Sequence, residues 1–209
     1  MRFSDRELRD LAVAWLALGL AFTFFLDRRI VHAVFGAGIR TLSLDAVGTT
    51  FVVSLATVGV AFLLHELAHK VVAVHFDQVA EFRADYGMLL VAVAGGLAGF
   101  LFAAPGAVYH RGRITRRESG LIALAGPVTN LGLAVVSLVV LAAGTGPAGA
   151  FAARIGSLGL FINLLLAGFN MLPYGPLDGR KVFAWDRTVY VAVAAPSIAL
   201  GLWVLFGGL

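Results

Sequence analysis

Two histidines and a glutamate stand close together in the sequence His65-Glu66-Leu67-Ala68-His69, which has the pattern H-E-x-x-H. Positions i and i+4 of a helix lie on one face, so the imidazoles of His65 and His69 can bind a single metal ion. Glu66 lies about 100° further round the helix axis, close enough to reach a water molecule on that ion. Zinc lowers the pKa of such a water towards 7, and a nearby carboxylate can take its proton. The spacing therefore predicts a zinc ion on the two histidines, with Glu66 as the base.

The surroundings of this motif strengthen the prediction. The same pattern occurs by chance in soluble helices, where a solvated face explains it, but here it lies within the apolar stretch 61–74. Ionisable groups inside a membrane helix cost about 2.5 kcal/mol or more, and by default they indicate a functional site.

A third zinc ligand must come from elsewhere, because a catalytic zinc usually has three protein ligands and a water. The chain has no cysteine, which leaves a distant His, Asp or Glu. Asp178, in PYGPLDGRK, is the best placed, since a broken helix there can turn its side chain inward. An aspartate before a glycine is also an ordinary turn residue. From the residues alone, both interpretations of Asp178 stay open.

The composition indicates an integral membrane protein. Of the 209 residues, 60% are hydrophobic and 13% are charged, whereas soluble domains have about 45–50% apolar and about 25% charged residues. The net charge of +4 could indicate nucleic-acid binding, but the basic residues lie in short stretches between apolar runs, as in membrane-protein loops. The apolar run 11–26 follows three arginines and lacks a small-residue cleavage site, so we expect a retained anchor.

Five apolar stretches are long enough to cross a bilayer as helices, which takes about 20 residues. They cover residues 8–26, 46–76, 120–143, 154–172 and 189–206. A mixed connection covers 27–45 and a Gly/Pro-rich turn covers 144–149. The prolines and glycines of NMLPYGPLDG must end the fourth helix.

The apolar segment 87–109 could cross the membrane once, or enter and return by a turn near Gly95-Gly96. Loop charge favours the return. A return of the segment places the loops 77–86, 110–118 and 179–187 on one face of the membrane with the N-terminus. By the positive-inside rule this basic face is cytoplasmic. Asp178 then reaches the same side as the histidines. The opposite face keeps only four basic residues, Arg28, Arg29, Arg40 and Arg154.

Three motifs in this order resemble the site-2 protease family of intramembrane zinc metalloproteases: HELAH, then AGPVTN some sixty residues later, then NMLPYGPLDG. The family pattern has H-E-x-x-H on one core helix and N-x-x-P…L-D-G on another. The resemblance covers roughly residues 46–185. The second motif matches at Asn170, Pro173, Leu177, Asp178 and Gly179.

The resemblance implies that His65, His69 and Asp178 hold one zinc ion per chain, while Glu66 activates water. It also implies that Asn170 positions or polarises the scissile carbonyl. In the family, a β-like loop between the first two core helices accepts a substrate strand, and the segment 87–109 occupies that position. For AGPVTN itself, packing and hydrogen bonding to a neighbouring segment is the interpretation that the residues favour.

We therefore expect an all-α polytopic membrane protein of five to six transmembrane helices. It forms a single membrane domain, with an anchor and connection at 1–45, a catalytic core with three core helices at 46–185 and a last helix at 186–209. The expected activity is that of an intramembrane zinc metalloendopeptidase. Its partners would be the lipid bilayer and a membrane protein with a locally unwound transmembrane segment, and not nucleic acid.

A non-catalytic membrane protein is the alternative, either a metal transporter or a degenerate relative that binds partners. A transporter should have further intramembrane acids or histidines along a path, and the apolar stretches contain few. A degenerate relative should have lost a ligand or Glu66, and each is present.

Overall fold

The computed structural model describes residues 2–38, 43–100, 105–144, 146 and 149–207. Within them, five helical segments are long and apolar enough to cross a membrane, as expected. The protein is therefore an all-α polytopic membrane protein. These segments are Asp5–Leu26, Leu44–His75, Arg116–Ala143, Ala150–Asn170 and Arg187–Leu205.

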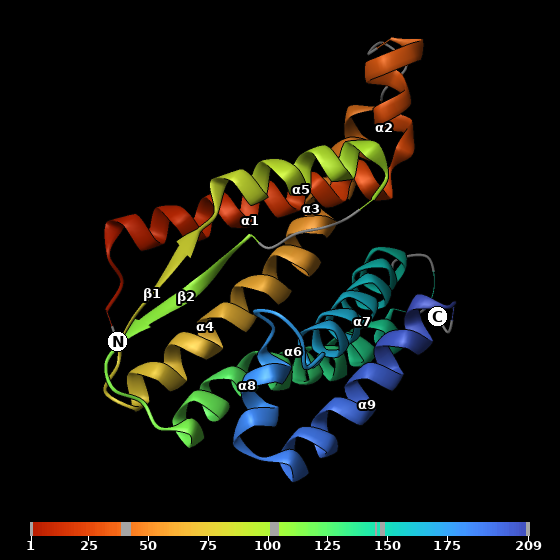
Figure 1. The fold of residues 1–209 in the computed structure, drawn as a ribbon. Coiled ribbons are helices and arrows are strands. Elements are labelled where there is room, and N and C mark those ends of the chain that lie inside the picture. The colour runs from red at the N-terminus through yellow and green to blue at the C-terminus, as the bar shows by residue number, and fades with distance from the viewer. Residues whose placement is uncertain (1, 39–42, 101–104, 145, 147–148, 208–209) are drawn as a thin grey trace. The chain divides into compact units, whose positions relative to one another are not determined.

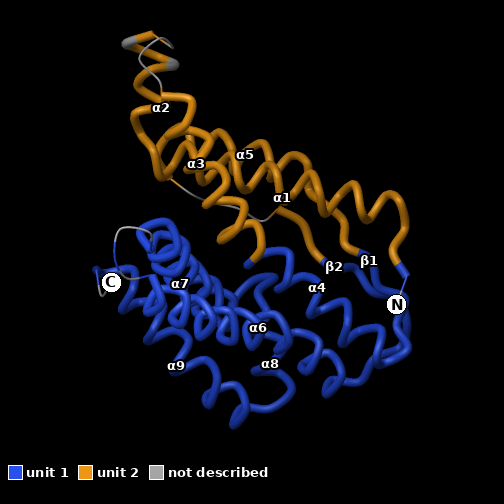
Figure 2. The backbone as a smooth tube through the Cα atoms, turned by 180° about the vertical axis from the view of Figure 1, so that it is seen from behind, with its two compact units in different colours: residues 1–2, 61–81, 108–209 blue, residues 3–60, 82–107 orange. Residues whose placement is uncertain are grey.

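The chain forms two compact units, coloured separately in Figure 2. The first contains residues 1–2, 61–81 and 108–209, and the second contains residues 3–60 and 82–107. The division of the chain into an anchor, a catalytic core and a last helix stays a prediction.

In the second unit, α1 (Asp5–Leu26) packs against α5 (Tyr86–Ala98) and against α3 (Leu44–Ser54) with the π-helical turn η3 (Leu55–Gly59). Small residues allow these close approaches. A Cβ atom on Gly96 of α5 would collide with the carbonyl of Ala21 in α1. The indole of Trp15 donates to the carbonyl of Leu55 over 3.0 Å and so satisfies a carbonyl of the π turn.

Two buried carboxylates of α1 bind backbone amides of strand β1 (Val79–Ala84). Glu7 accepts from the amide of Phe82 at 3.0 Å, and Asp10 accepts from the amide of Ala84 at 3.4 Å. The hydroxyl of Tyr86 also donates to Asp10, at 2.7 Å. These acids, which break the basic pattern of the N-terminus in sequence, therefore supply acceptors to a strand.

The segment after β1 leaves and then returns to its starting point. Figure 1 shows β1 and β2 (Gly106–Arg111) side by side and running in opposite directions, as a two-stranded sheet. Between them, the amide of Asp85 donates to the carbonyl of Pro105 at 3.1 Å. Helix α5 has only 13 residues, about 20 Å, less than the thickness of a hydrocarbon core. The segment thus begins and ends at the same sheet, as a re-entrant segment would, and its residues 101–104 lie outside the described part of the chain.

The expected turn near Gly95-Gly96 is wrong in position. Helix α5 continues to Ala98 and ends at Gly99, whose left-handed backbone (φ 91°) suits glycine. The guanidinium of Arg28 donates to the carbonyls of Gly96 and Leu97, each at 3.0 Å. A helix can end at this depth because these carbonyls have a partner within the protein.

In the first unit, α6 (Arg116–Ala143) packs on α7 (Ala150–Asn170) and α8 (Asp178–Trp185), and α7 packs on α9 (Arg187–Leu205). A capping box of Thr115 and Glu118 begins α6. The expected break follows Asn170, and α8 then begins at Asp178. A Cβ atom on Gly179 would collide with the carbonyl of Met171, so only glycine lets the chain fold back this closely.

The helix boundaries differ from the predicted spans by only a few residues. Helix α4 (Val60–His75) continues α3 and η3 and carries the H-E-x-x-H motif. The short helices α2 (Arg28–His32), η1 (Ala33–Ala37) and α8 were not predicted. Arg40 and residues 145, 147 and 148 of the predicted turn lie outside the described residues.

Candidate metal centre

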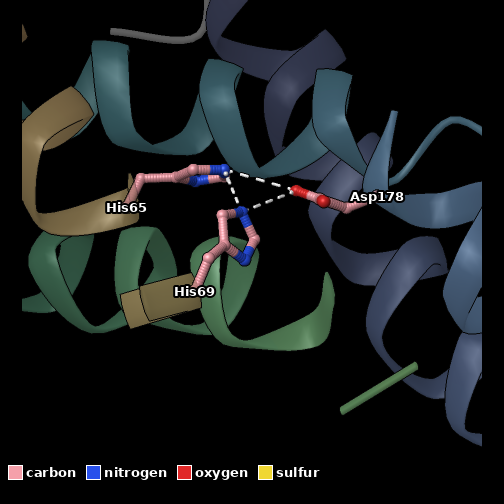
Figure 3. Close-up of side chains that lie close together, drawn as sticks. All are labelled: His65, His69 and Asp178. Carbon is pink, nitrogen blue, oxygen red and sulfur yellow. Dashed lines mark hydrogen bonds and ion pairs between the residues drawn. The ribbon is translucent and has the colours of Figure 1, made fainter. Parts of the chain in front are cut away.

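The structure brings together the three residues predicted to bind metal. His65 and His69 project from α4 towards Asp178, the first residue of α8 (Figure 3). All three are buried, with at most 8% of each residue exposed. The two Nε2 atoms lie 3.0 Å apart, and each lies 3.3 Å from Oδ2 of Asp178. One atom from each residue therefore faces a common point.

These separations fit a zinc ion. Zinc binds imidazole nitrogen and carboxylate oxygen at about 2.0–2.2 Å in tetrahedral geometry, so two of its ligand atoms should lie about 3.3 Å apart. The three observed distances are 3.0, 3.3 and 3.3 Å. His65, His69 and Asp178 can thus form one face of a tetrahedron and leave a fourth position open.

The other ring nitrogens fix the histidine tautomers. Nδ1 of His65 lies 2.6 Å from Oδ1 of Asn130, and Nδ1 of His69 lies 2.7 Å from the carbonyl oxygen of Ile122. Both partners are acceptors, so both Nδ1 atoms carry the proton and both Nε2 atoms present a lone pair. Three electron-pair donors then face one another, and only a cation among them relieves the repulsion. A proton can contact two of them, whereas a metal ion contacts all three.

Charge favours the ionised form of the aspartate. When a proton is the cation among these atoms, burial acts to raise the pKa of the Asp178 carboxyl, but the positive charge at His69 and hydrogen bonding from the imidazoles outweigh burial and lower the pKa below its ordinary value. The carboxylate is the form that binds a metal ion.

Glu66 is also buried, and the charges of the other three residues act on it. Its Oε2 accepts a hydrogen bond of 3.2 Å from the amide of Val108 in β2. The predicted base is therefore next to the strand that closes the re-entrant segment.

Asn170 lies at the end of a helix, and the structure does not test the role that the resemblance implies for it. It is the last residue of α7, and its Nδ2 donates to the carbonyl of Leu166 in the same helix at 3.0 Å. No hydrogen bond joins it to the other predicted site residues in the described part of the chain. Its role at the scissile carbonyl stays a prediction.

Two features of AGPVTN belong to the site. Asn130 is fully buried and binds His65, so the neighbouring segment expected to bond with this motif is the metal-binding helix itself. Pro127 removes the helical donor of the Ala123 carbonyl, and the carbonyl of Ile122, just before it, accepts from His69. A second asparagine, Asn163 in α7, binds Asn130 and was not predicted, because nothing in its sequence context sets it apart.

Gly126 lies directly against the two metal-facing nitrogens. A Cβ atom built on Gly126 would lie 2.5 Å from Nε2 of His65 and 2.6 Å from Nε2 of His69. A side chain there would collide with both of these ligand atoms. Its absence is a second observation of this structure that fits a metal ion.

Comparison with known proteins gives the family. The chain is 38% identical over 207 residues to the Methanocaldococcus jannaschii protein named "Putative zinc metalloprotease MJ0611", covering 98% of this chain and 97% of the relative. The chain belongs to this family of zinc metalloproteases. It is also 35% identical over 146 residues to the Bacillus subtilis "Putative zinc metalloprotease YwhC", covering 60% of this chain and 65% of that relative. No family model and no solved structure matches the chain.

Membership of this zinc metalloprotease family agrees with the donor set. Two imidazoles and a carboxylate are ligands typical of catalytic zinc, and an open fourth position is what a hydrolytic site requires.

Replacing Gly126 by alanine should weaken zinc binding by the zinc metalloprotease, because the added methyl group would collide with both Nε2 atoms. The zinc affinity, measured by chelator competition on detergent-purified protein, should fall at least about tenfold, the lower end of the losses typical of damage around a zinc site. Gly132→Ala, in the same helix, is the control, because an added Cβ atom there meets nothing within 4 Å. Equal zinc affinity in the two variants would contradict the inference that Gly126 adjoins the bound ion.

Proposed function

We propose that this zinc metalloprotease is an intramembrane endopeptidase of the site-2 protease type. The observation that carries the proposal is the depth of the donor cluster: His65, Glu66 and His69 lie buried within a helical segment of 32 residues that is apolar enough to span a membrane. The order of the three sequence motifs supports it further. Hydrolysis at such a site acts on a peptide bond within or near a transmembrane segment.

The roles of the side chains follow from their chemistry. Zinc held by His65, His69 and Asp178 would polarise a substrate carbonyl and lower the pKa of a water molecule. Glu66 accepts a proton from the water molecule as the water oxygen bonds to the carbonyl carbon of the substrate. It later returns a proton to the leaving amine as the C–N bond breaks. The Nδ1 bonds to Asn130 and Ile122 hold the two imidazoles in place throughout.

The hydrogen bond between Val108 and Glu66 supports an extended substrate. Among the residues that the structure describes, β2 pairs with β1 alone. A peptide segment that pairs with the other edge of β2, and takes the amide of Val108 over from Glu66, would bring its peptide groups beside Glu66. A helical segment cannot pair in this way, because its amides are bonded internally. The substrate must therefore unwind locally before hydrolysis.

Metal content and turnover test the proposal together. Wild type purified in detergent should contain one zinc per chain, and His65→Ala and Asp178→Asn should both lose it, because each removes one of three ligands. Glu66→Gln should keep its zinc but cleave a membrane-protein substrate about 10²–10⁴ times more slowly, the usual contribution of a general base.

The outcomes separate this proposal from its alternatives. Zinc in wild type together with undiminished cleavage by Glu66→Gln would exclude the mechanism. A well-folded wild type that takes up no zinc when it is supplied would favour a non-catalytic relative that binds partners. Zinc transport into liposomes without proteolysis would favour a transporter.

Substrate helices that unwind easily should be cleaved faster. Glycine and proline destabilise a helix interior by about 1 and about 3 kcal/mol relative to alanine, and 1.4 kcal/mol corresponds to about a tenfold change in equilibrium. With enzyme and single-span reporters in the same liposomes, a Gly-Pro reporter should be cleaved at least about tenfold faster than an all-Leu reporter of equal length. Equal initial rates would contradict the need for unwinding.

The N-terminus and the opening of the site are proposed to face the cytoplasm, from the distribution of basic residues. Because the chain has no cysteine, single cysteines report on sidedness without further changes. A membrane-impermeant thiol reagent added to spheroplasts should label Gly146→Cys and leave Arg113→Cys unlabelled until the membrane is permeabilised. Both positions are exposed. The opposite labelling pattern would invert the topology.

A further inference from the structure

Three buried side chains form a hydrogen-bonded chain that ends on a candidate zinc ligand. Nδ2 of Asn163 in α7 donates to the carbonyl of Gly159 at 2.8 Å, and Oδ1 of Asn163 accepts from Nδ2 of Asn130 in α6 at 2.9 Å. Oδ1 of Asn130 lies 2.6 Å from Nδ1 of His65 in α4. Asn163, Asn130 and His65 are 3%, 0% and 5% exposed, so water does not compete with these bonds.

We propose that Asn163 is a positioning residue for the zinc site, which through Asn130 holds His65 in the tautomer that leaves Nε2 free for the metal. This inference rests on the zinc site of the proposed function. Asn163 itself would not touch the ion or the substrate.

The chain has one internally consistent direction. The bond to Gly159 commits the amide nitrogen of Asn163 as a donor, so only its oxygen is available to Asn130. That oxygen requires the amide nitrogen of Asn130, which turns the oxygen of Asn130 towards His65. Nδ1 of His65 must then carry the proton.

Without Asn163, the orientation of Asn130 is poorly determined. The other acceptor for Nδ2 of Asn130 is the carbonyl of Ala61 at 3.3 Å, a longer bond. A flipped Asn130 would present its NH2 group to Nδ1 of His65 and favour the proton on Nε2. An imidazole protonated on Nε2 cannot bind the metal through that atom. Buried amide networks of this kind have large effects when one member is lost.

Helix α7 contains a matched control. Asn170, like Asn163, donates from Nδ2 to a carbonyl four residues earlier, in this case that of Leu166. Asn163 also binds Asn130, whereas Asn170 makes no bond to the metal-binding residues in the described part of the chain. Loss of an asparagine from α7 as such is therefore separable from loss of the contact with Asn130.

The experiment measures zinc affinity by chelator competition on full-length protein in detergent, and the d–d absorption of the Co2+-substituted protein. Asn163→Leu removes the acceptor at similar size and should weaken zinc binding about 10- to 100-fold, with an altered Co2+ spectrum. Asn163→Asp keeps an acceptor oxygen for Asn130, and when protonated also a donor to Gly159, so its affinity should lie close to wild type. Asn170→Leu should bind zinc as wild type does.

Two results would overturn the inference. The first is a wild-type zinc affinity in Asn163→Leu. The second is an equal loss of zinc affinity in Asn163→Leu and Asn170→Leu, because this would indicate a general effect on α7. If Asn163→Leu does not fold, Asn163→Ala takes its place in the same comparison. A wild type without zinc would overturn the proposed function and this inference with it, whereas a zinc-binding wild type with unaffected Asn163 variants would overturn this inference alone.

Discussion

The fold of the first unit depends on one constraint: a metal-binding imidazole inside an apolar helix needs a partner for its second nitrogen. In water this partner would be solvent, but at this depth it must be protein. The bond from His65 to Asn130 and the bond from His69 to Ile122 meet that need, and both partners lie on α6. Helix α6 must therefore contact α4 at these residues, and its sequence has to permit that approach.

The spacing along α6 shows how one helix serves both histidines. Ile122, Gly126 and Asn130 recur at intervals of four, so they share a face. Ile122 and Asn130, which accept the Nδ1 protons, are about 12 Å apart along the axis of α6. The Cβ atoms of His65 and His69 are about 6 Å apart along the axis of α4. The imidazoles thus diverge at Nδ1 and converge at Nε2, opposite Gly126. His65 binds the later residue of α6 and His69 the earlier one, which requires the two helices to run antiparallel.

Sequence reasoning could predict the features that depend on residue type and period: the five spans, the break before Asp178 and the ligand pair four residues apart. The distribution of loop charge favoured a return of segment 87–109 to its own side of the membrane. The turn at Gly95-Gly96 was wrong in position, because α5 continues through both glycines to Ala98 and ends at Gly99; Gly96 packs against α1. Asn163 could not be predicted, since its role comes from the rotation of α7 against α6, which no local pattern specifies. Strand β1 is likewise defined by its tertiary partners.

Polar groups in apolar segments of this chain fall into two classes, which the structure separates. The carboxylates of Glu7 and Asp10 meet amide or hydroxyl donors, and the guanidinium of Arg28 meets carbonyls. Such donor–acceptor pairs are complete without a ligand and serve the fold. At Asp178, His65 and His69, atoms that all accept face one another at 3.0–3.3 Å, with the Nδ1 protons already committed elsewhere. Burial and charge are common to both classes, so neither alone separates a metal site from a structural pair. Acceptor atoms that face one another do identify a metal site, because only a cation between them can pair with all of them.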